Sequence, residues 1–251
     1  MKHENPRSAL WHRWGRAALD LIYPARCPGC LKRLTESGAP GDFCDACGGV
    51  MQPIEEPFCQ RCAEPFPGEI SGDFTCPNCS GRPAAYEFAV CRMLSRGPVR
   101  EAVHRLKYEG VVVMRLALAR LMLSALNDRR LADAGWLLVP VPLHPRKRRE
   151  RGYNQSAELA KSLSKLSGLP WLDALKRTRY TDSQAGLDRA GRLKNLRGAF
   201  AVKRFAARHL RDQDVLLVDD VLTTGATAHE CAQTLRAGGA RRVVVITVAR
   251  G

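Results

Sequence analysis

The sequence predicts an α/β fold in which helices flank a parallel sheet, preceded by a small cysteine-rich module. From about residue 84 onward, short apolar runs typical of strands buried on both faces alternate with segments of helical periodicity. Ahead of them, eight of the ten cysteines fall into four C-x2-C pairs. We therefore predict three parts: a helical segment at 1–26, a cysteine-rich module at 27–83 and an α/β domain at 84–251.

The composition is that of a folded, basic protein. Hydrophobic residues make up 45% of the 251 residues, which is enough for an apolar core, and no low-complexity tract indicates disorder. The charge is uneven, because residues 1–26 carry +3, residues 27–91 carry −5 and residues 92–251 carry +17, giving +15 in total. Such an excess suits phosphate-rich ligands or nucleic acid, although it also simply aids solubility.

The N-terminal segment has the pattern of an amphipathic helix. From Ser8 to Ile22, Trp11 and Trp14 share one face with other apolar residues, and the arginines lie off that face. Two interpretations remain open: a helix in weak contact with a membrane surface, and a helix that caps the rest of the protein. The small apolar face favours the second.

No secretory or membrane-spanning segment is predicted. The N-terminus lacks a continuous apolar core followed by a small-residue cleavage pattern, and no apolar run reaches about 18 residues. We therefore expect a cytoplasmic protein, in which paired cysteines act as metal ligands rather than as disulfides because the compartment is reducing.

The cysteine-rich module contains an internal repeat. Each half reads C-x2-C, thirteen residues, C-x2-C, and the second half begins 32 residues after the first. One C-x2-C knuckle supplies two thiolates, and two knuckles complete a tetrahedral set around a zinc ion. We predict two structural Zn²⁺ ions with sequential pairing, although interleaved pairing fits the spacings too. The predicted ligands are Cys27, Cys30, Cys44 and Cys47 for one ion and Cys59, Cys62, Cys76 and Cys79 for the other.

Thioredoxin-like redox chemistry is the weaker alternative for these pairs, because nothing around them resembles a βαβ unit. The remaining two cysteines, Cys91 and Cys231, stand outside the repeat. Each is predicted to be a small core residue rather than a nucleophile.

The α/β domain is predicted to alternate strands and helices. Glu87 to Leu94 has the pattern of a strand, helices are expected at 98–107 and 112–126, and Trp136 to Val141 is a second buried strand. The pattern continues with a helix at 157–166, a strand at 215–218, a helix at 228–237 and a last strand at 241–248.

Two connections in this domain are strongly basic. Residues 144–156 contain five basic residues and follow the strand that begins at Trp136. Open α/β sheets bind their ligands at the carboxyl ends of strands, so we predict that this connection faces an anion rather than being only a solvated loop. Residues 176–204 contain nine basic and two acidic residues, and we expect part of this stretch to be mobile and to close over a phosphate.

The most informative stretch is Val215-Leu-Leu-Val-Asp-Asp-Val-Leu-Thr-Thr-Gly-Ala-Thr227. A strand, a loop of small residues and a helix N-terminus together form an anion site, because backbone N–H groups and the helix dipole favour a phosphate there. The adjacent carboxylates accept hydrogen bonds, as a neighbouring polyol would require. The combination predicts a phosphorylated sugar, and the alternative is a buried strand that ends in an acidic turn and a Thr-capped helix.

This order of residues resembles the phosphoribosyl pyrophosphate (PRPP) signature of type I phosphoribosyltransferases. The resemblance implies that Asp219 and Asp220 are the catalytic pair that holds the ribose hydroxyls. It implies further that the 5′-phosphate is held by the loop residues Thr223, Thr224, Gly225, Ala226 and Thr227.

Over nearly all of residues 23–250 the chain also resembles the ComF family of phosphoribosyltransferase-like proteins. The resemblance rests on the repeated cysteine pairs, the PRPP signature and the motifs Leu-Lys-Tyr at 106–108, Pro-Val-Pro-Leu-His at 140–144, Arg-Gly-Tyr-Asn-Gln at 151–155, Arg177, Gln184, Leu187, Arg192, Asn195 and Phe200. It implies a type I phosphoribosyltransferase fold with a link to DNA uptake, and it implies no particular acceptor.

Two functions follow as hypotheses. In the first, the protein is a phosphoribosyltransferase that binds PRPP, or another phosphorylated ribose, with Mg²⁺ and holds pyrophosphate with Leu143, His144 and Arg146. In the second, the PRPP fold is a sensor or a nucleic-acid-handling module, in which zinc ribbons and basic loops bind single-stranded DNA without catalysis. An aromatic content of 6% argues modestly against a base-stacking platform. No pattern indicates the acceptor or the oligomeric state.

Overall fold

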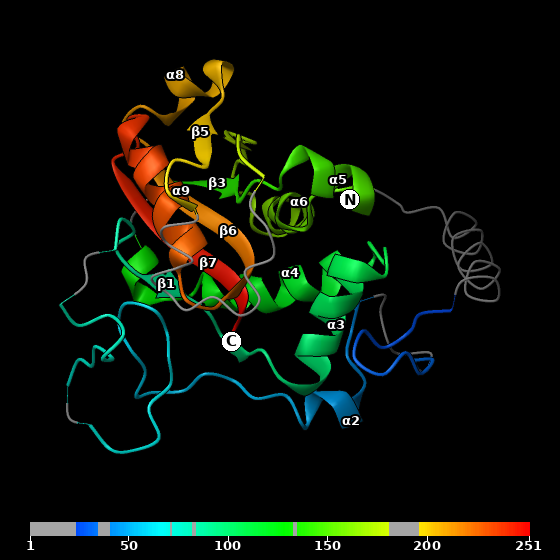
Figure 1. The fold of residues 1–251 in the computed structure, drawn as a ribbon. Coiled ribbons are helices and arrows are strands. Elements are labelled where there is room, and N and C mark those ends of the chain that lie inside the picture. The colour runs from blue at the N-terminus through cyan, green and yellow to red at the C-terminus, as the bar shows by residue number, and fades with distance from the viewer. Residues whose placement is uncertain (1–23, 35–40, 71, 82–83, 133–134, 181–195) are drawn as a thin grey trace, which may run out of the picture.

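The computed structural model describes residues 24–34, 41–70, 72–81, 84–132, 135–180 and 196–251 (Figure 1). Its centre is a parallel sheet in the order β1 (Ala89–Val90), β7 (Arg242–Arg250), β6 (Asp214–Leu222) and β3 (Trp136–Pro140), with β2 (Met93–Leu94) also paired to β7. The predicted parallel sheet is therefore confirmed.

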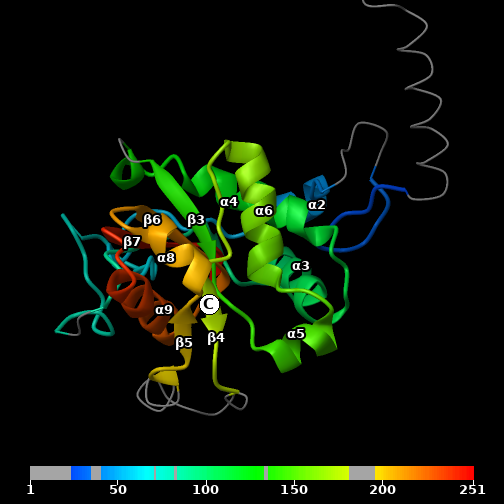
Figure 2. The same ribbon diagram turned by 90° about the horizontal axis from the view of Figure 1, so that it is seen from above.

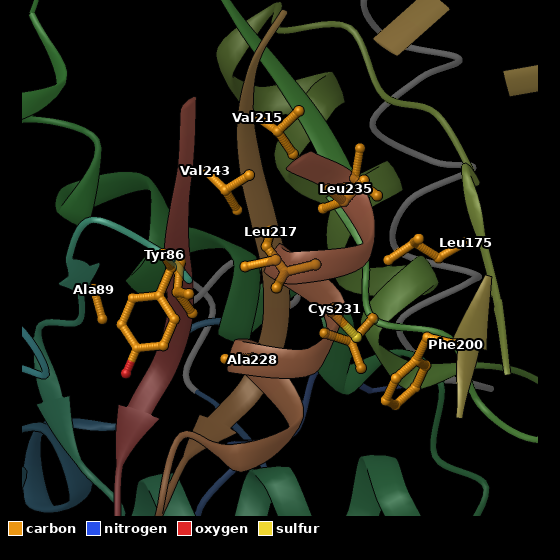
Figure 3. Packing of buried hydrophobic residues seen from close by; sticks show 14 of the residues in the cluster. Tyr86, Ala89, Leu175, Phe200, Val215, Leu217, Ala228, Cys231, Leu235 and Val243 are labelled. Carbon is orange, nitrogen blue, oxygen red and sulfur yellow. The ribbon is translucent and has the colours of Figure 1, made fainter. Parts of the chain in front are cut away.

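Both faces of the sheet are covered, as the continuous apolar runs predicted. Successive residues of a strand point to opposite faces, so Val215 and Leu217 join one apolar cluster while Leu216 and Val218 join another. Helix α9 (Ala226–Ala237) covers the first face, and its residues Cys231 and Leu235 pack on Leu217 and Val243 (Figure 3). The second face is covered by α3 (Gly97–Tyr108), α4 (Met114–Ala125) and α6 (Gln155–Ser167), which Figure 2 shows on the other side of the sheet.

Three sequence predictions need correction or refinement. The strand expected over 87–94 is divided into two short strands, β1 and β2. The basic connection after β3 is not a loop but contains the helix α5 (Pro145–Arg151), because proline occupies its first turn and His144 caps it. The second basic connection begins with β4 (Leu175–Arg177), which pairs antiparallel with β5 (Phe200–Val202) outside the main sheet.

The remaining described elements are short. They are α2 (Asp45–Gly48), the 3-10 helices η1 (Arg129–Leu131) and η2 (Arg204–Ala206), and α8 (Ala207–Leu210). The amphipathic helix predicted at 8–22 lies outside the described residues, as do residues 181–195 of the second basic connection.

The cysteine-rich module packs on the α/β domain. Arg105 of α3 donates hydrogen bonds to the carbonyl oxygens of Pro28 and Gly29, at 2.6 and 2.8 Å. The second group of cysteines lies within the same buried apolar cluster as the α9 face of the sheet. The boundary near residue 84 stays a prediction, and the two parts on either side of it share buried surface.

In the described part of the chain, no helix combines the length and the apolar character needed to cross a membrane.

We predict that replacing Gly225, which has a φ of +75° and precedes α9, destabilises the protein. A Cβ there would lie 2.8 Å from the Tyr86 hydroxyl oxygen, whereas a Cβ at Gly168, with a φ of +77°, meets nothing within 4 Å. Gly168→Ala should cost about 1–2 kcal/mol of stability through its left-handed backbone alone. Gly225→Ala should cost about 1–3 kcal/mol more because it also overpacks the loop against Tyr86. Chemical denaturation of both variants measures the difference, and equal losses would show that Tyr86 does not constrain the loop.

Candidate functional site

The carboxyl ends of β3 and β6 lie at the same edge of the sheet, because the two strands are parallel. A cavity of about 440 Å³ opens at this edge. Its walls come from α3, the β3–α5 connection, the start of α6, β4 and the end of β6. Its lining residues include Lys107, Leu143, Arg177, Asp219, Asp220, Thr223 and Thr227.

Asp220 is buried in the cavity wall and forms an ion pair with a half-buried lysine. Because β6 continues to Leu222, Asp219 and Asp220 belong to a strand and project toward opposite faces. Asp220 meets α3, where the Lys107 amine lies 2.8 Å from its Oδ1. The same oxygen accepts a hydrogen bond from the Val221 amide at 2.6 Å. Its second oxygen, Oδ2, is buried and has no hydrogen-bond partner in the part of the chain that the structure describes.

Asp219 has a different environment. Its Oδ1 accepts hydrogen bonds from the Ser156 hydroxyl and from the Asp220 amide, both at 2.9 Å. Burial and the neighbouring Asp220 carboxylate raise the pKa of Asp219 to about 7, against the opposing effects of Lys107 and Ser156. The two adjacent acids are therefore not equivalent: one has a cation at contact distance, and the other titrates near neutral pH.

The loop after β6, which the sequence predicts to hold a phosphate, turns at Gly225. Gly225 adopts the left-handed conformation immediately before α9, and the amide of Ala226 donates a hydrogen bond of 3.5 Å to the Thr224 hydroxyl. Among the predicted phosphate residues, Thr223 and Thr227 line the cavity. Thr224 and Gly225 line a neighbouring cavity on the other side of the loop, and Ala226 is buried.

The residues predicted to hold pyrophosphate divide into two groups. Leu143 lines the cavity. His144 instead caps α5, where its Nδ1 accepts a hydrogen bond from the Arg146 amide at 3.2 Å, and its ring packs on Tyr180. The Arg146 side chain pairs with Glu150 and lies over the Tyr180 ring. Neither His144 nor Arg146 is among the residues that line the cavity.

Several lining residues were not predicted as site residues. Lys107 and Arg177 are the main ones, and burial lowers the pKa of the Arg177 guanidinium. The family motifs contain several of these lining residues: Lys107 lies in Leu-Lys-Tyr, and Asn154 and Gln155 lie in Arg-Gly-Tyr-Asn-Gln. Membership of these motifs is the sequence signal that could have assigned them to the site. Ser156, which donates to Asp219, directly follows that last motif.

The eight paired cysteines form two clusters of four. The sulfurs of Cys27, Cys30, Cys44 and Cys47 lie within 4.8 Å of one another, and so do those of Cys59, Cys62, Cys76 and Cys79. Sequential pairing is therefore confirmed and interleaved pairing is excluded. Four thiols gathered in this way fit a structural Zn²⁺ ion in each cluster.

The backbone around each cluster supports this assignment. The Cys44 amide donates to the Cys27 sulfur, and the Cys76 amide donates to the Cys59 sulfur, both at 3.3 Å. Burial alone would raise the pKa values of these two thiols, but such amide bonds lower them to about 6 for Cys27 and about 7 for Cys59. All four cysteines of the second cluster are buried, whereas Cys30 of the first is exposed. Outside the clusters, Cys91 and Cys231 are buried, as predicted.

Comparison with known proteins adds three similarities. A family model described as "Double zinc ribbon domain" matches residues 18–80. The chain is 30% identical over 239 residues to "Competence protein F" of Haemophilus influenzae, covering 94% of each chain. It is 32% identical over 216 residues to "DNA utilization protein YhgH" of Escherichia coli K12, covering 83% of this chain and 90% of that one.

Among solved structures, the allosteric regulatory enzyme of purine biosynthesis aligns with a TM-score of 0.36 and 21% identity, over 53% of this chain and 25% of that one.

The raised pKa of Asp219 predicts that the stability of the fold depends on pH. In the unfolded chain an aspartate titrates near 3.9, so between about pH 4 and pH 7 the folded state holds a proton that the unfolded state has lost. The free energy of unfolding should therefore decrease as pH rises from about 4 to 7. Asp219→Asn should remove the share of this decrease that comes from Asp219. Thermal unfolding from pH 4 to pH 8 measures it, with Asp173→Asn as the control. An unchanged pH profile in Asp219→Asn would contradict the raised pKa.

Proposed function

Because the chain belongs to the competence protein F (ComF) family, we propose that it binds PRPP, or another 5-phosphorylated ribose, in the cavity at the end of β6 and transfers the phosphoribosyl group. The observation that carries the proposal is the combination found at one strand end. Two carboxylates that could accept hydrogen bonds from a polyol lie in the same cavity as a loop that could bind a phosphate. The loop turns at Gly225, and only two residues separate Asp220 from its first threonine, Thr223.

The two ends of such a ligand have different partners in this proposal. The 5′-phosphate would accept hydrogen bonds from the hydroxyls of Thr223 and Thr227 and from the amides that begin α9. The ribose hydroxyls would donate to Asp219, since no described residue donates to its Oδ2. Asp220 would contribute mainly through Lys107, which keeps its charge paired when no ligand is bound.

The proposed reaction is a substitution at the anomeric carbon of the ribose. The bond from this carbon to the pyrophosphate oxygen breaks, and its electron pair leaves with pyrophosphate. A nucleophilic atom of the acceptor forms the new bond and loses its proton. Charge develops on the leaving group, so cations near Leu143 and Arg177 would stabilise it, and positioning would supply much of the catalysis.

Mg²⁺ is part of this proposal because carboxylate and diphosphate oxygens are ligands that it prefers. The buried, unpartnered Oδ2 of Asp220 fits such a cation in the described part of the chain. Bound to the diphosphate, the ion would neutralise the charge of the leaving group.

A second candidate function is the binding of single-stranded DNA, and a separate cavity favours it. A basic groove of about 970 Å³ adjoins the first cavity and shares Leu143, Asn154 and Arg177 with it. We define the basic groove by the cations that line it: Arg148, Arg149, Lys161, Lys176, Arg177 and Lys203. Glu158 and Asp173 are the acids among its described lining residues, so the surface is strongly positive.

A cytoplasmic location fits either function. The ten cysteines are free, and thiols of this kind persist as zinc ligands where the compartment is reducing. The location therefore stays a proposal that rests on the chemistry of the cysteine clusters.

The first function predicts a loss of affinity in two kinds of variant. Replacing both Asp219 and Asp220 by Asn should weaken PRPP binding about tenfold or more, because hydrogen bonds to charged groups are lost. If the acids met no ligand, their removal would instead tighten anion binding by relieving repulsion. Thr223→Ala with Thr227→Ala should weaken ribose 5-phosphate and leave pyrophosphate binding nearly unchanged.

Calorimetry with PRPP, ribose 5-phosphate and pyrophosphate separates these outcomes, with Asp173→Asn as a control that removes one carboxylate charge outside the cavity. Tighter PRPP binding by the double-Asn variant would refute the assignment of the acids to the ribose.

The second function can be tested on α5, because only some of its basic residues line the basic groove. Arg148 and Arg149 line the basic groove, whereas Arg146 and Lys147 do not. Arg148→Gln with Arg149→Gln should reduce the slope of log affinity against log salt for single-stranded DNA by about 1.4, since each lost phosphate contact removes about 0.7. Arg146→Gln with Lys147→Gln removes the same charge from the same helix and should change the slope less. Equal changes would show that DNA does not use this groove.

A further inference from the structure

The second cysteine cluster lies directly behind the loop that follows β6. A cavity of about 320 Å³ separates the two, and its wall contains Cys62 and Cys79 on one side and Thr223, Thr224 and Gly225 on the other. Thr223 also lines the candidate ribose-phosphate cavity. The loop therefore has a ligand-facing side and a side that faces the zinc ligands.

One chain of contacts joins this cluster to the end of β6. Glu64, two residues after the ligand Cys62, forms an ion pair with Arg250 at the end of β7. Arg250 is 8% exposed and donates a hydrogen bond of 2.9 Å to the carbonyl oxygen of Leu222. Leu222 is the last residue of β6, so this guanidinium binds the backbone at the point where the loop begins.

A second contact supports the middle of the loop. Tyr86 is buried among the second cysteine cluster and the α9 face of the sheet. Its hydroxyl oxygen approaches Gly225 so closely that an added Cβ would lie 2.8 Å away. The left-handed backbone at Gly225 and the surface of Tyr86 together determine how the amides that begin α9 are presented.

The first cysteine cluster contacts other elements. Arg105 of α3 binds the carbonyl oxygens within its first knuckle, and Asp42 pairs with Arg120 of α4. In the described part of the chain, neither contact involves residues 222–227. The two zinc sites therefore support different walls of the molecule.

We propose that the second cysteine cluster positions the phosphate site. Zinc held by this cluster fixes Glu64 and Tyr86, and these two residues hold the loop at 222–225 in the conformation that receives a 5′-phosphate. The zinc ligands are Cys59, Cys62, Cys76 and Cys79. The inference rests on the proposed binding of a phosphorylated ribose. It assigns Glu64, Tyr86 and Arg250 as positioning residues, none of which touches the ligand. Zinc occupancy at this cluster then sets the affinity for the phosphate, whereas occupancy at the first cluster does not.

The test compares two variants. Each removes one carboxylate from an ion pair that joins the cysteine-rich module to the α/β domain. Glu64→Gln breaks the pair with Arg250, and Asp42→Asn breaks the pair with Arg120. The dissociation constants for ribose 5-phosphate and for pyrophosphate are measured by calorimetry on the full chain, with zinc content checked in each preparation. Glu64→Gln should weaken ribose 5-phosphate about fivefold, a change of about 1 kcal/mol, and leave pyrophosphate within about twofold. Asp42→Asn should change neither.

The sign of the change is informative, because removing a negative charge near a phosphate would by itself tighten binding. Equal or tighter ribose 5-phosphate binding in Glu64→Gln would overturn the inference. A parallel loss of affinity for both ligands would also overturn it, since that result indicates general loosening of the fold.

A second pair of variants tests zinc itself. Cys79→Ser and Cys30→Ser should each lower the zinc content from two ions to about one per chain. Only Cys79→Ser should weaken ribose 5-phosphate, and equal effects of the two variants would contradict the assignment. If the wild-type chain does not bind ribose 5-phosphate at all, the proposed function fails. If it binds and either Glu64→Gln or Cys79→Ser leaves the affinity unchanged, only the present inference fails.

Discussion

Two adjacent carboxylates at the end of a buried strand impose the constraint on which the rest of the site depends. Charged groups taken out of water must be paired or must titrate. Here both solutions are used, because Lys107 from α3 pairs with Asp220 and burial raises the pKa of Asp219 to about 7. The ion pair joins α3 to β6, and the Ser156 hydroxyl joins the start of α6 to the same point. A cavity with polar walls results where three elements converge.

The cysteine-rich module lies against the outside of the same site. Its first cysteine cluster contacts α3, which carries Lys107, and its second cluster faces the loop that begins α9 across a smaller cavity. Zinc ions would stabilise these small modules, which contain few apolar residues of their own. The basic groove beside the cavity supplies the positive surface that the net charge of the α/β domain predicts. A phosphorylated sugar and a longer polyanion would thus have adjoining but separable sites.

Much of the fold could be predicted from the sequence, because strands buried on both faces and helices of regular periodicity leave strong local patterns. The pairs of cysteines were also predicted, and only three-dimensional proximity decided between sequential and interleaved pairing. Helix α5 was not predicted, since its charge run indicates a loop while its capping signals, His144 and Pro145, are weaker. The partnership of Lys107 with Asp220 joins residues 113 positions apart, which no local pattern records. His144 and Arg146 were assigned by position in the chain, yet α5 directs them toward Tyr180 rather than into the cavity.

The proposed function requires that the end of β6 holds a phosphorylated ribose. A crystal structure of the zinc-loaded chain with ribose 5-phosphate would show this. We expect the phosphate at the hydroxyls of Thr223 and Thr227 and the amides that begin α9, with a ribose hydroxyl within hydrogen-bond distance of Asp219. A ligand found only in the basic groove, or a phosphate distant from this loop, would contradict it.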